Sequence, residues 1–244
     1  MKLYDLSGRD QLRFSPFCWK TRLALAHKGF EAEVVFLHFA DKDQLAFSGQ
    51  SWLPVLVDGG VIVSDSFEIA CYLERNYPER RTLFGSEIGI AGARFINAWV
   101  DRDLIPGIAR LLMQDILAAL APCDRAYFRA SREAAFGETV EQMHALRDER
   151  RPGFQASLAP LRAVLNVGAG TSAIGSPATG RFLSGSAPSY ADYSVFGAFQ
   201  FARIVSNYAL LDRDDPLVAW CERMLDCFDG LARNAATAHG SRVQ

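Results

Sequence analysis

The sequence predicts a small α/β domain followed by an all-α domain. The chain has 244 residues, which is enough for two domains of ordinary size. Up to about residue 80, short apolar runs alternate with helical patterns in the order βαβ and then ββα. After about residue 85 the strand signal disappears and helical patterns take over. We therefore expect domains at residues 1–80 and 90–244, with a linker near 79–89.

The first three elements follow from local signals. Leu3–Leu6 is a short apolar run typical of a strand. Ser15 and Pro16 then mark a helix start, because serine is a strong N-cap and proline suits the first helical position. The helix is expected to end at Gly29, a typical stop signal. Glu31–Phe36, rich in β-branched and aromatic residues, predicts the second strand.

A β-hairpin is predicted after a polar segment. Residues 38–52 show no regular pattern, and we expect an irregular loop there. Strands are predicted at Pro54–Val57 and Val61–Val63. The intervening Asp58-Gly59-Gly60 is a turn signal of the kind that joins hairpin strands.

Helices are predicted throughout the second domain. Ile88–Leu120 is helical in pattern, with Pro106-Gly107 as a kink. Arg125–Arg150 alternates charges, which indicates a mostly solvated helical face. Further helices are predicted at Phe154–Leu165, Tyr190–Tyr208 and Pro216–Leu231. A Gly/Ser/Thr-rich loop is predicted at Val167–Gly180.

Composition excludes several classes of function. The net charge of -2 gives no reason to expect nucleic acid as a partner. We find no apolar run near the ~20 residues of a membrane span and no secretory signal, so we expect a cytoplasmic protein without a membrane partner. The five scattered cysteines predict free thiols in a reducing compartment. The four histidines lack metal-ligand spacing, so no metal site is expected.

Ser15-Pro16-Phe17-Cys18 is the first segment that could carry chemistry. A hydroxyl at a helix N-terminus lies beside unpaired N–H groups and the positive end of the helix dipole, an arrangement that stabilises a nearby thiolate. Taken alone, Ser15 also fits an ordinary N-cap. Cys18 is expected to be a small packing residue, because no second cysteine at position 15 completes a redox pair.

Two further segments could bind a ligand. Pro54 opens a strand after a loop, where a cis bond would free the backbone of Leu53 to pair with an extended ligand. Asp65 and Ser66 open a helix that is predicted to end at Tyr77, and its N-terminal N–H groups could bind a carboxylate. The Ser66 hydroxyl adds a donor, and Asp65 could attract an ammonium group. In isolation these residues fit better an edge-strand proline and a helix cap, with Asp65 and Glu68 at capping-box spacing.

Together, in this order and spacing, the three segments resemble the glutathione-binding domain of glutathione S-transferases, over about residues 1–80. The resemblance implies a thioredoxin-like N-terminal domain and an all-α C-terminal domain. Ser189 and Asp192 support it, because they look like the Ser-x-x-Asp box that opens a buried helix in the second domain of this family.

The resemblance also assigns roles to single residues. Ser15 matches the hydroxyl that bonds the glutathione sulfur in serine-type members, and Leu53, before a cis Pro54, matches the residue whose backbone pairs with the cysteinyl unit. Asp65 and Ser66 match the pair that binds the γ-glutamyl ammonium and carboxylate. Lys42 lies where serine-type relatives often place a cation for the glycyl carboxylate.

Within the family, Ser15–Phe30 and Leu53–Ser66 look most like the bacterial β-etherases and their fungal etherase-like relatives. Members of that group cleave β-aryl ethers of lignin fragments with glutathione as co-substrate. The resemblance thus implies a transferase, usually a homodimer in this family, that attacks a hydrophobic aromatic molecule. The pocket for that molecule could draw on aromatic residues of the second domain, with Trp99, Tyr127, Phe128 and Tyr193 as candidates, although each of them taken singly fits core packing better.

Two alternative functions fit the same sequence. One is a glutathione-dependent isomerase or dehalogenase on this fold. The other is a non-catalytic protein that carries hydrophobic ligands. Turnover of an aryl halide distinguishes the carrier from the enzymes.

Overall fold

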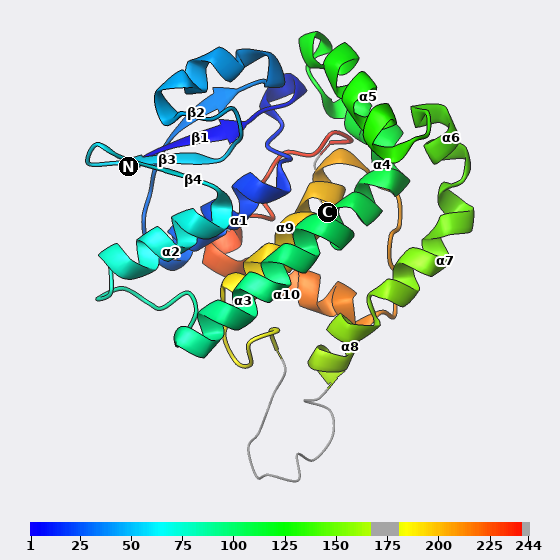
Figure 1. Ribbon diagram of the computed structural model, residues 1–244. Coiled ribbons are helices and arrows are strands. Elements are labelled where there is room, and N and C mark those ends of the chain that lie inside the picture. Colours follow the sequence, from blue (N-terminus) through cyan, green and yellow to red (C-terminus); the bar gives the residue numbers. More distant parts are fainter. Residues whose placement is uncertain (167–180, 241–244) are drawn as a thin grey trace.

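The computed structural model describes residues 1–166 and 181–240 (Figure 1). Within these residues the strands form one mixed sheet in the order β2-β1-β3-β4. β1 and β2 are parallel, whereas β3 is antiparallel to both β1 and β4. The strand bounds are β1 Lys2–Leu6, β2 Glu33–Leu37, β3 Val55–Asp58 and β4 Val61–Ser64. The α/β class predicted for the N-terminal part is confirmed.

The connections between the strands form where the local signals predicted them. Helix α1, Pro16–His27, joins the parallel strands β1 and β2, as a parallel crossover requires. It is followed by Gly29 at a φ of 72°, a conformation that favours glycine. In the β3–β4 hairpin Gly59 and Gly60 have φ of 55° and 90°, as a tight hairpin turn with two left-handed residues demands. Helix α2, Ser66–Asn76, follows β4.

The segment after β2 is more regular than predicted. Residues Phe39–Ser48 form consecutive 3-10 turns, η2, where the sequence indicated an irregular loop, and a shorter turn η1 covers Arg9–Gln11. A 3-10 helix has three residues per turn, so it leaves no 3.6-residue pattern in a sequence. The backbone N–H of His38 donates to Asp41 Oδ2 at 2.8 Å and closes the start of η2.

The C-terminal part is helical, as predicted. Its first long helix is interrupted by a π-helical stretch, η3, that ends at Leu104, two residues before Pro106. Proline has no N–H for the regular ladder, which accounts for the interruption at this point. The bounds are α3 Glu87–Trp99, η3 Val100–Leu104, α4 Ile105–Ala119, α5 Pro122–Phe136, α6 Val140–Ala145, α7 Arg147–Ser157, α8 Ala159–Asn166, α9 Tyr190–Val205 and α10 Pro216–Gly230.

The predicted helix over residues 125–150 is three helices. Gly137 ends α5 in the left-handed conformation at a φ of 69°. Thr139 then caps α6 through a capping box with Gln142. The helix predicted over residues 154–165 is likewise divided at Leu158, between α7 and α8.

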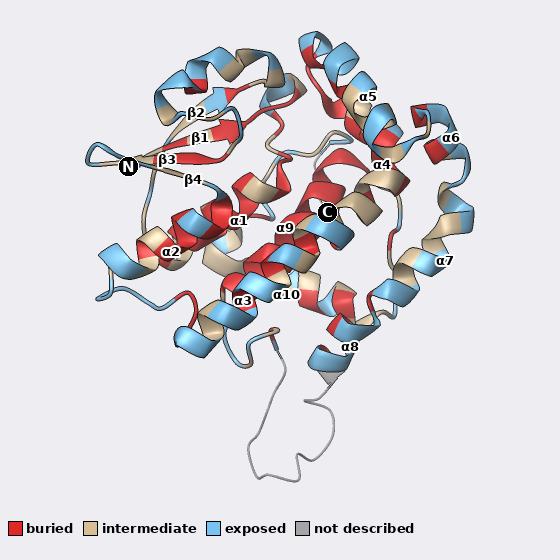
Figure 2. Cartoon of the chain, in the orientation of Figure 1, coloured by how far each residue is buried: buried red, intermediate tan, exposed pale blue. Residues whose placement is uncertain are grey.

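Helix α9 is the centre of the helical part and packs against α1, α3 and α4. All but one of its residues are buried, and Figure 2 shows them at the heart of the molecule. Its start confirms the predicted capping box: Ser189 Oγ accepts from Ala191 N at 3.2 Å, and Asp192 Oδ2 accepts from Ser189 N at 3.1 Å. Gly197 allows the close contact with α1, because a Cβ there would lie 2.7 Å from Pro16 O.

A buried ion pair also joins α1 to the helical part. The Lys20 side chain is fully buried, and its Nζ donates to Asn97 Oδ1 at 2.9 Å and to Asp101 Oδ1 at 2.5 Å. Burial lowers the pKa of Lys20, and the Asp101 carboxylate opposes that shift. The two parts of the chain are therefore fixed to each other by packing and by charge.

Other expectations have simple outcomes. The five cysteines are free thiols, as predicted. None of the helices in the described ranges combines the length and the apolar character needed to cross a membrane. The loop predicted at Val167–Gly180 lies outside the described residues.

Candidate functional site

Ser15 lies where β1 leads into α1, at the N-terminus of that helix. Its Oγ accepts from the backbone N–H of Cys18 at 3.3 Å, the N-cap interaction that the sequence predicted. The residue is only 4% exposed, yet its hydroxyl lines a cavity. The Oγ lone pair is engaged with the helix, so the hydroxyl hydrogen can donate to a group in the cavity.

Cys18 is a core residue, as the sequence analysis favoured. It is 1% exposed, and its Sγ lies 3.5 Å from the backbone N–H of Leu6, which donates to it. Burial raises the pKa of Cys18 well above its ordinary value, and the nearby Asp5 carboxylate adds to the increase. The thiol therefore stays protonated and is not a nucleophile at neutral pH.

Leu53 and Pro54 join the end of the polar segment to β3. Their peptide bond is cis, as predicted. Both residues line a second cavity, of about 260 Å³, and Leu53 also lines the cavity of Ser15. Trp52, directly before them, is 65% exposed and borders both cavities.

Asp65 and Ser66 also line this second cavity. Asp65 caps α2, because its Oδ1 accepts from Phe67 N at 2.8 Å and from Glu68 N at 3.1 Å. The reciprocal half of the predicted capping box is not formed; Glu68 lies 3.5 Å from Arg94 instead.

The Ser66 hydroxyl is a buried polar group that the fold leaves without a partner. Ser66 is 1% exposed, and its Oγ has no hydrogen bond within the described residues. The Tyr190 hydroxyl lies near it but donates to Asn97 Oδ1, at 3.5 Å. An unpartnered hydroxyl in a cavity wall is costly in the empty protein and becomes favourable when a ligand supplies the partner.

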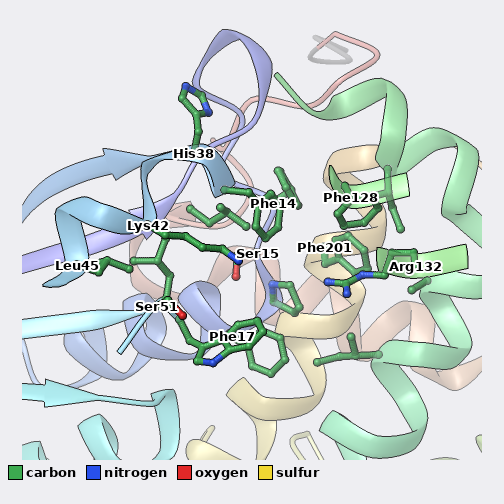
Figure 3. A pocket seen from close by; sticks show the side chains of 18 residues that line it. Phe14, Ser15, Phe17, His38, Lys42, Leu45, Ser51, Phe128, Arg132 and Phe201 are labelled. Carbon is green, nitrogen blue, oxygen red and sulfur yellow. The ribbon is translucent and has the colours of Figure 1, made fainter. Parts of the chain in front are cut away.

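The two cavities adjoin each other, because Phe17, Trp52 and Leu53 line both. The cavity beside Ser15 has a volume of about 160 Å³, and its lining residues come from both parts of the chain. Figure 3 shows these side chains converging on one space. They are Leu6, Phe14, Ser15, Pro16, Phe17, His38, Phe39, Lys42, Leu45, Ser51, Trp52, Leu53, Ile105, Ala109, Ile116, Phe128, Arg132 and Phe201.

Lys42 lies on η2 and lines the cavity of Ser15. Its Nζ donates to the Tyr127 hydroxyl at 2.6 Å and lies 4.3 Å from the centre of that ring. It is also 5.5 Å from the centre of the Trp52 ring, a cation–π distance. Within the described ranges no carboxylate pairs with Lys42, so its charge is available to an anion.

Helix α5 fixes the position of η2, a role that the sequence analysis missed. The buried Asp124 carboxylate accepts from Phe39 N at 3.1 Å and from Ala40 N at 2.9 Å. These are the first free N–H groups of η2, which Asp124 caps from another part of the chain. The carboxylate thereby holds the segment that carries Lys42.

The same face of α5 reaches the cavity. Asp124, Phe128 and Arg132 are spaced four residues apart, and residues at that spacing share one face of a helix. Phe128 and Arg132 line the cavity of Ser15. Only Asp124 and Phe128 of α5 are buried, so the predicted, mostly solvated face is confirmed for this helix. The sequence did not indicate that one face of α5 would reach the cavity.

The four aromatic residues of the second domain that were candidates for the pocket lie in different places. Phe128 lines the cavity, and Tyr127 contacts Lys42 at its edge. Tyr193 is fully buried in the core, where its hydroxyl is 2.6 Å from His27 Nδ1. Trp99 is packed against the core. The sequence analysis missed the rings of Phe14, Phe39 and Phe201; the position of Phe14 directly before Ser15 was the available signal.

The arrangement can hold an extended polar molecule next to an apolar one. The second cavity offers the Asp65 carboxylate and the free Ser66 hydroxyl at a helix N-terminus, which suit a zwitterionic end group. The cavity of Ser15 offers one hydroxyl at a helix N-terminus within aromatic walls. A thiol placed at Ser15 would be stabilised as its thiolate and would face an aromatic molecule.

Comparisons with known proteins agree with this geometry. The profile of the glutathione S-transferase C-terminal domain matches residues 91–212, and that of the N-terminal domain matches residues 14–76. Glutathione S-transferase Z1 of Arabidopsis thaliana is 33% identical over 84 residues, 30% of this chain and 38% of that protein. Glutathione S-transferase 1 of Dianthus caryophyllus is 34% identical over 88 residues, 34% of this chain and 37% of that protein. The matched region thus spans well under half the length of these curated relatives.

Two fungal crystal structures share the fold. Glutathione transferase GSTFuA3 from Phanerochaete chrysosporium has a TM-score of 0.79 at 21% identity, over 94% of this chain and 96% of that one. CsGST63524 of Ceriporiopsis subvermispora, a glutathione S-transferase solved in complex with glutathione, has a TM-score of 0.77 at 23% identity, over 93% of this chain and 96% of that one.

Proposed function

The chain belongs to the glutathione S-transferase family, and from this premise we propose that it activates glutathione as a thiolate for attack on a hydrophobic aromatic electrophile. One observation carries the proposal: the Ser15 hydroxyl lies at a helix N-terminus in a cavity walled by aromatic rings, and Asp65 and Ser66 line the cavity that adjoins it. The first suits the electrophile and the second suits the peptide.

In the proposed complex, glutathione spans both cavities. Its sulfur accepts a hydrogen bond from Ser15, and its cysteinyl unit pairs with the backbone of Leu53, next to Pro54. The Ser66 hydroxyl binds the γ-glutamyl carboxylate, and Asp65 binds the ammonium group. Lys42 binds the glycyl carboxylate, exchanging its contact with the Tyr127 hydroxyl for an ion pair. This assignment gives a partner to Ser66 Oγ, which the protein alone does not provide.

The energy that thiolate formation requires is modest. A free thiol has a pKa of about 8.5, so only a few per cent is ionised at pH 7. Lowering that pKa by about two units requires roughly 2.7 kcal/mol. One hydroxyl donor to a charged sulfur supplies about 1.5–3 kcal/mol, and the dipole of α1 adds to it.

We expect the Ser66→Ala and Asp65→Asn variants to weaken glutathione binding about ten- to a hundredfold, because each loses one charge-assisted interaction worth about 1.5–3 kcal/mol. Ser66→Ala should not lower the free energy of unfolding, since Ser66 Oγ has no partner in the protein. Asparagine at position 65 keeps the cap of α2 and removes only the charge. Calorimetric titration with glutathione measures both effects, and wild-type affinity in both variants would remove these residues from the site.

For the reaction we propose cleavage of β-aryl ethers. The thiolate would attack the carbon that bears the aryl ether, a carbon–sulfur bond would form, and a phenolate would leave. A phenolate leaves readily because its conjugate acid has a pKa near ~10. The cavity of about 160 Å³ is close to the roughly 150 Å³ that holds one benzene ring. The second ring of a lignin dimer would then lie toward the mouth of the cavity, beside Trp52.

The test is incubation with a fluorogenic α-keto aryl ether of lignin-dimer type, with and without glutathione. Release of the phenol only with glutathione is the expected result. Turnover of 1-chloro-2,4-dinitrobenzene without phenol release would contradict etherase activity and leave a transferase of other substrates. Binding of aromatic compounds without turnover of either reagent would indicate a carrier protein.

Further parts of the proposal concern assembly and location. We propose a homodimer, supported by Ile88 and Phe95 of α3, which are 85% and 76% exposed. Sedimentation velocity measures this directly. We further propose domain bounds of 1–80 and 90–244 and a cytoplasmic location, supported by the five free thiols.

A further inference from the structure

The cavity beside Ser15 carries positive charge that its walls do not balance. Lys42 and Arg132 both line it, and none of the described residues that line it is a carboxylate. Most of the other lining residues are apolar. A cation in apolar surroundings is unfavourable unless an opposite charge accompanies it. The cavity is therefore suited to an anion.

Arg132 has unused hydrogen-bonding capacity. Its Nη1 donates to the adjacent Ser131 Oγ at 3.2 Å, and its guanidinium lies 4.8 Å from the centre of the Phe128 ring. No ion pair involves Arg132 within residues 1–166 and 181–240, although an arginine offers five donors. Burial lowers the pKa of this guanidinium.

A neighbour on the same helix shows the usual arrangement. Arg129 Nη1 lies 3.1 Å from Glu133 and 2.9 Å from Glu141, so its charge is balanced at the surface. Acidic residues are thus present around α5 but pair with Arg129 rather than with Arg132. Arg132 instead points into the cavity from the side opposite to Lys42 (Figure 3).

We propose that Arg132 binds a carboxylate of the aromatic electrophile, so that the preferred substrates are aromatic acids. This inference rests on the proposed transferase function, in which Lys42 is assigned to glutathione and Arg132 is left for the second substrate. The planar guanidinium matches a carboxylate through two parallel hydrogen bonds. Phe128, at 4.8 Å from the guanidinium, is placed to contact the ring that carries the carboxylate.

The test compares two aryl halides that differ in one carboxylate, 4-chloro-3,5-dinitrobenzoate and 2-chloro-1,3-dinitrobenzene. Both react by the same step: the thiolate forms a carbon–sulfur bond and chloride leaves. In the Arg132→Gln variant we expect the KM for the benzoate to rise about ten- to a hundredfold. The KM for the neutral halide should stay within about threefold of the wild-type value. Arg132→Lys keeps the charge but not the two-point contact, so its KM for the benzoate should lie between those of the wild type and of Arg132→Gln.

Two matched variants separate the roles. Arg129→Gln removes an arginine from the same helix that is paired outside the cavity, and it should leave both KM values unchanged. Lys42→Gln should raise the KM for glutathione and leave the ratio of the KM values for the two halides unchanged. A rise in the glutathione KM of Arg132→Gln, or equal losses on both halides, would overturn the inference. Absence of glutathione-dependent turnover by the wild-type enzyme with both halides and with the aryl ether would instead refute the proposed function.

Discussion

Replacing Ser15 by alanine is expected to lower kcat about ten- to a hundredfold and to leave the affinity for glutathione nearly unchanged. The hydroxyl should contact only the sulfur, while the peptide is held by groups in the adjoining cavity. A hydrogen bond to a charged group contributes about 1.5–3 kcal/mol, and this contribution is made to the thiolate rather than to the thiol. The loss therefore appears in turnover.

The pH dependence gives a second readout of the Ser15→Ala variant. The hydroxyl favours the ionised sulfur, so its removal raises the pKa of bound glutathione. The deficit in rate should then be largest near pH 6–7 and decrease as the pH rises toward the roughly 8.5 of a free thiol. A pH–rate profile of kcat from stopped-flow or steady-state assays measures the shift.

A control variant is needed because Ser15 also caps α1. Losing an N-cap serine costs about 1 kcal/mol of stability. Ser86→Ala removes the equivalent cap of α3, where Ser86 Oγ accepts from Gly89 N at 3.1 Å, and Ser86 does not line either cavity. This variant should lose similar stability and keep full activity. If Ser15→Ala kept wild-type kinetics, another group would have to activate the thiol.

Replacing Asp192 by alanine is expected to lower the free energy of unfolding by roughly 3–5 kcal/mol. The Asp192 side chain is fully buried, and its Oδ1 accepts from Leu183 N at 2.7 Å and from Trp220 Nε1 at 3.1 Å. Its Oδ2 accepts from Ser189 N at 3.1 Å. Truncation leaves three donors without an acceptor in the core and removes the capping box of α9.

The measurement is urea unfolding followed by circular dichroism. For a chain of this size the expected loss corresponds to a decrease in Tm of about 10 °C. Asp226→Ala is the matched control on α10, because Asp226 is 68% exposed and pairs with Arg233 at the surface. Such a pair contributes about 0–1 kcal/mol. Equal stability of the two variants would mean that water replaces the lost carboxylate.

The sequence predicted the elements whose signals are local. Ser15 with Pro16, the Gly59-Gly60 turn and the cap at Asp65 each fix a helix or turn within a few residues, and the structure has all of them. The family resemblance then grouped residues that lie far apart in the sequence, and the structure places them around two adjoining cavities.

The sequence could not predict contacts that depend on tertiary placement. Asp124 and Arg132 belong to a run of charged residues in which every position resembles a solvated surface. Only the position of α5 shows that Asp124 is buried against η2 and that Arg132 reaches the cavity. The helical turns of η2 were missed for a different reason, since a 3-10 segment has no periodicity that a helical pattern would detect.

The Asp124 cap on η2 has a consequence for how far the two domains are separable. Glutathione is expected to bind through the N-terminal domain, yet the position of Lys42 is set by a carboxylate that the C-terminal domain contributes. A chimera that joined residues 1–80 to the helical domain of a relative would inherit Ser15, the residue proposed to activate the thiol, without the group that aligns this lysine. Exchange of the helical domain of this chain is therefore constrained by Asp124 in addition to the packing of α1 against α9, and we expect the recipient to keep its peptide affinity only if the donor helix carries an acidic residue at the equivalent point.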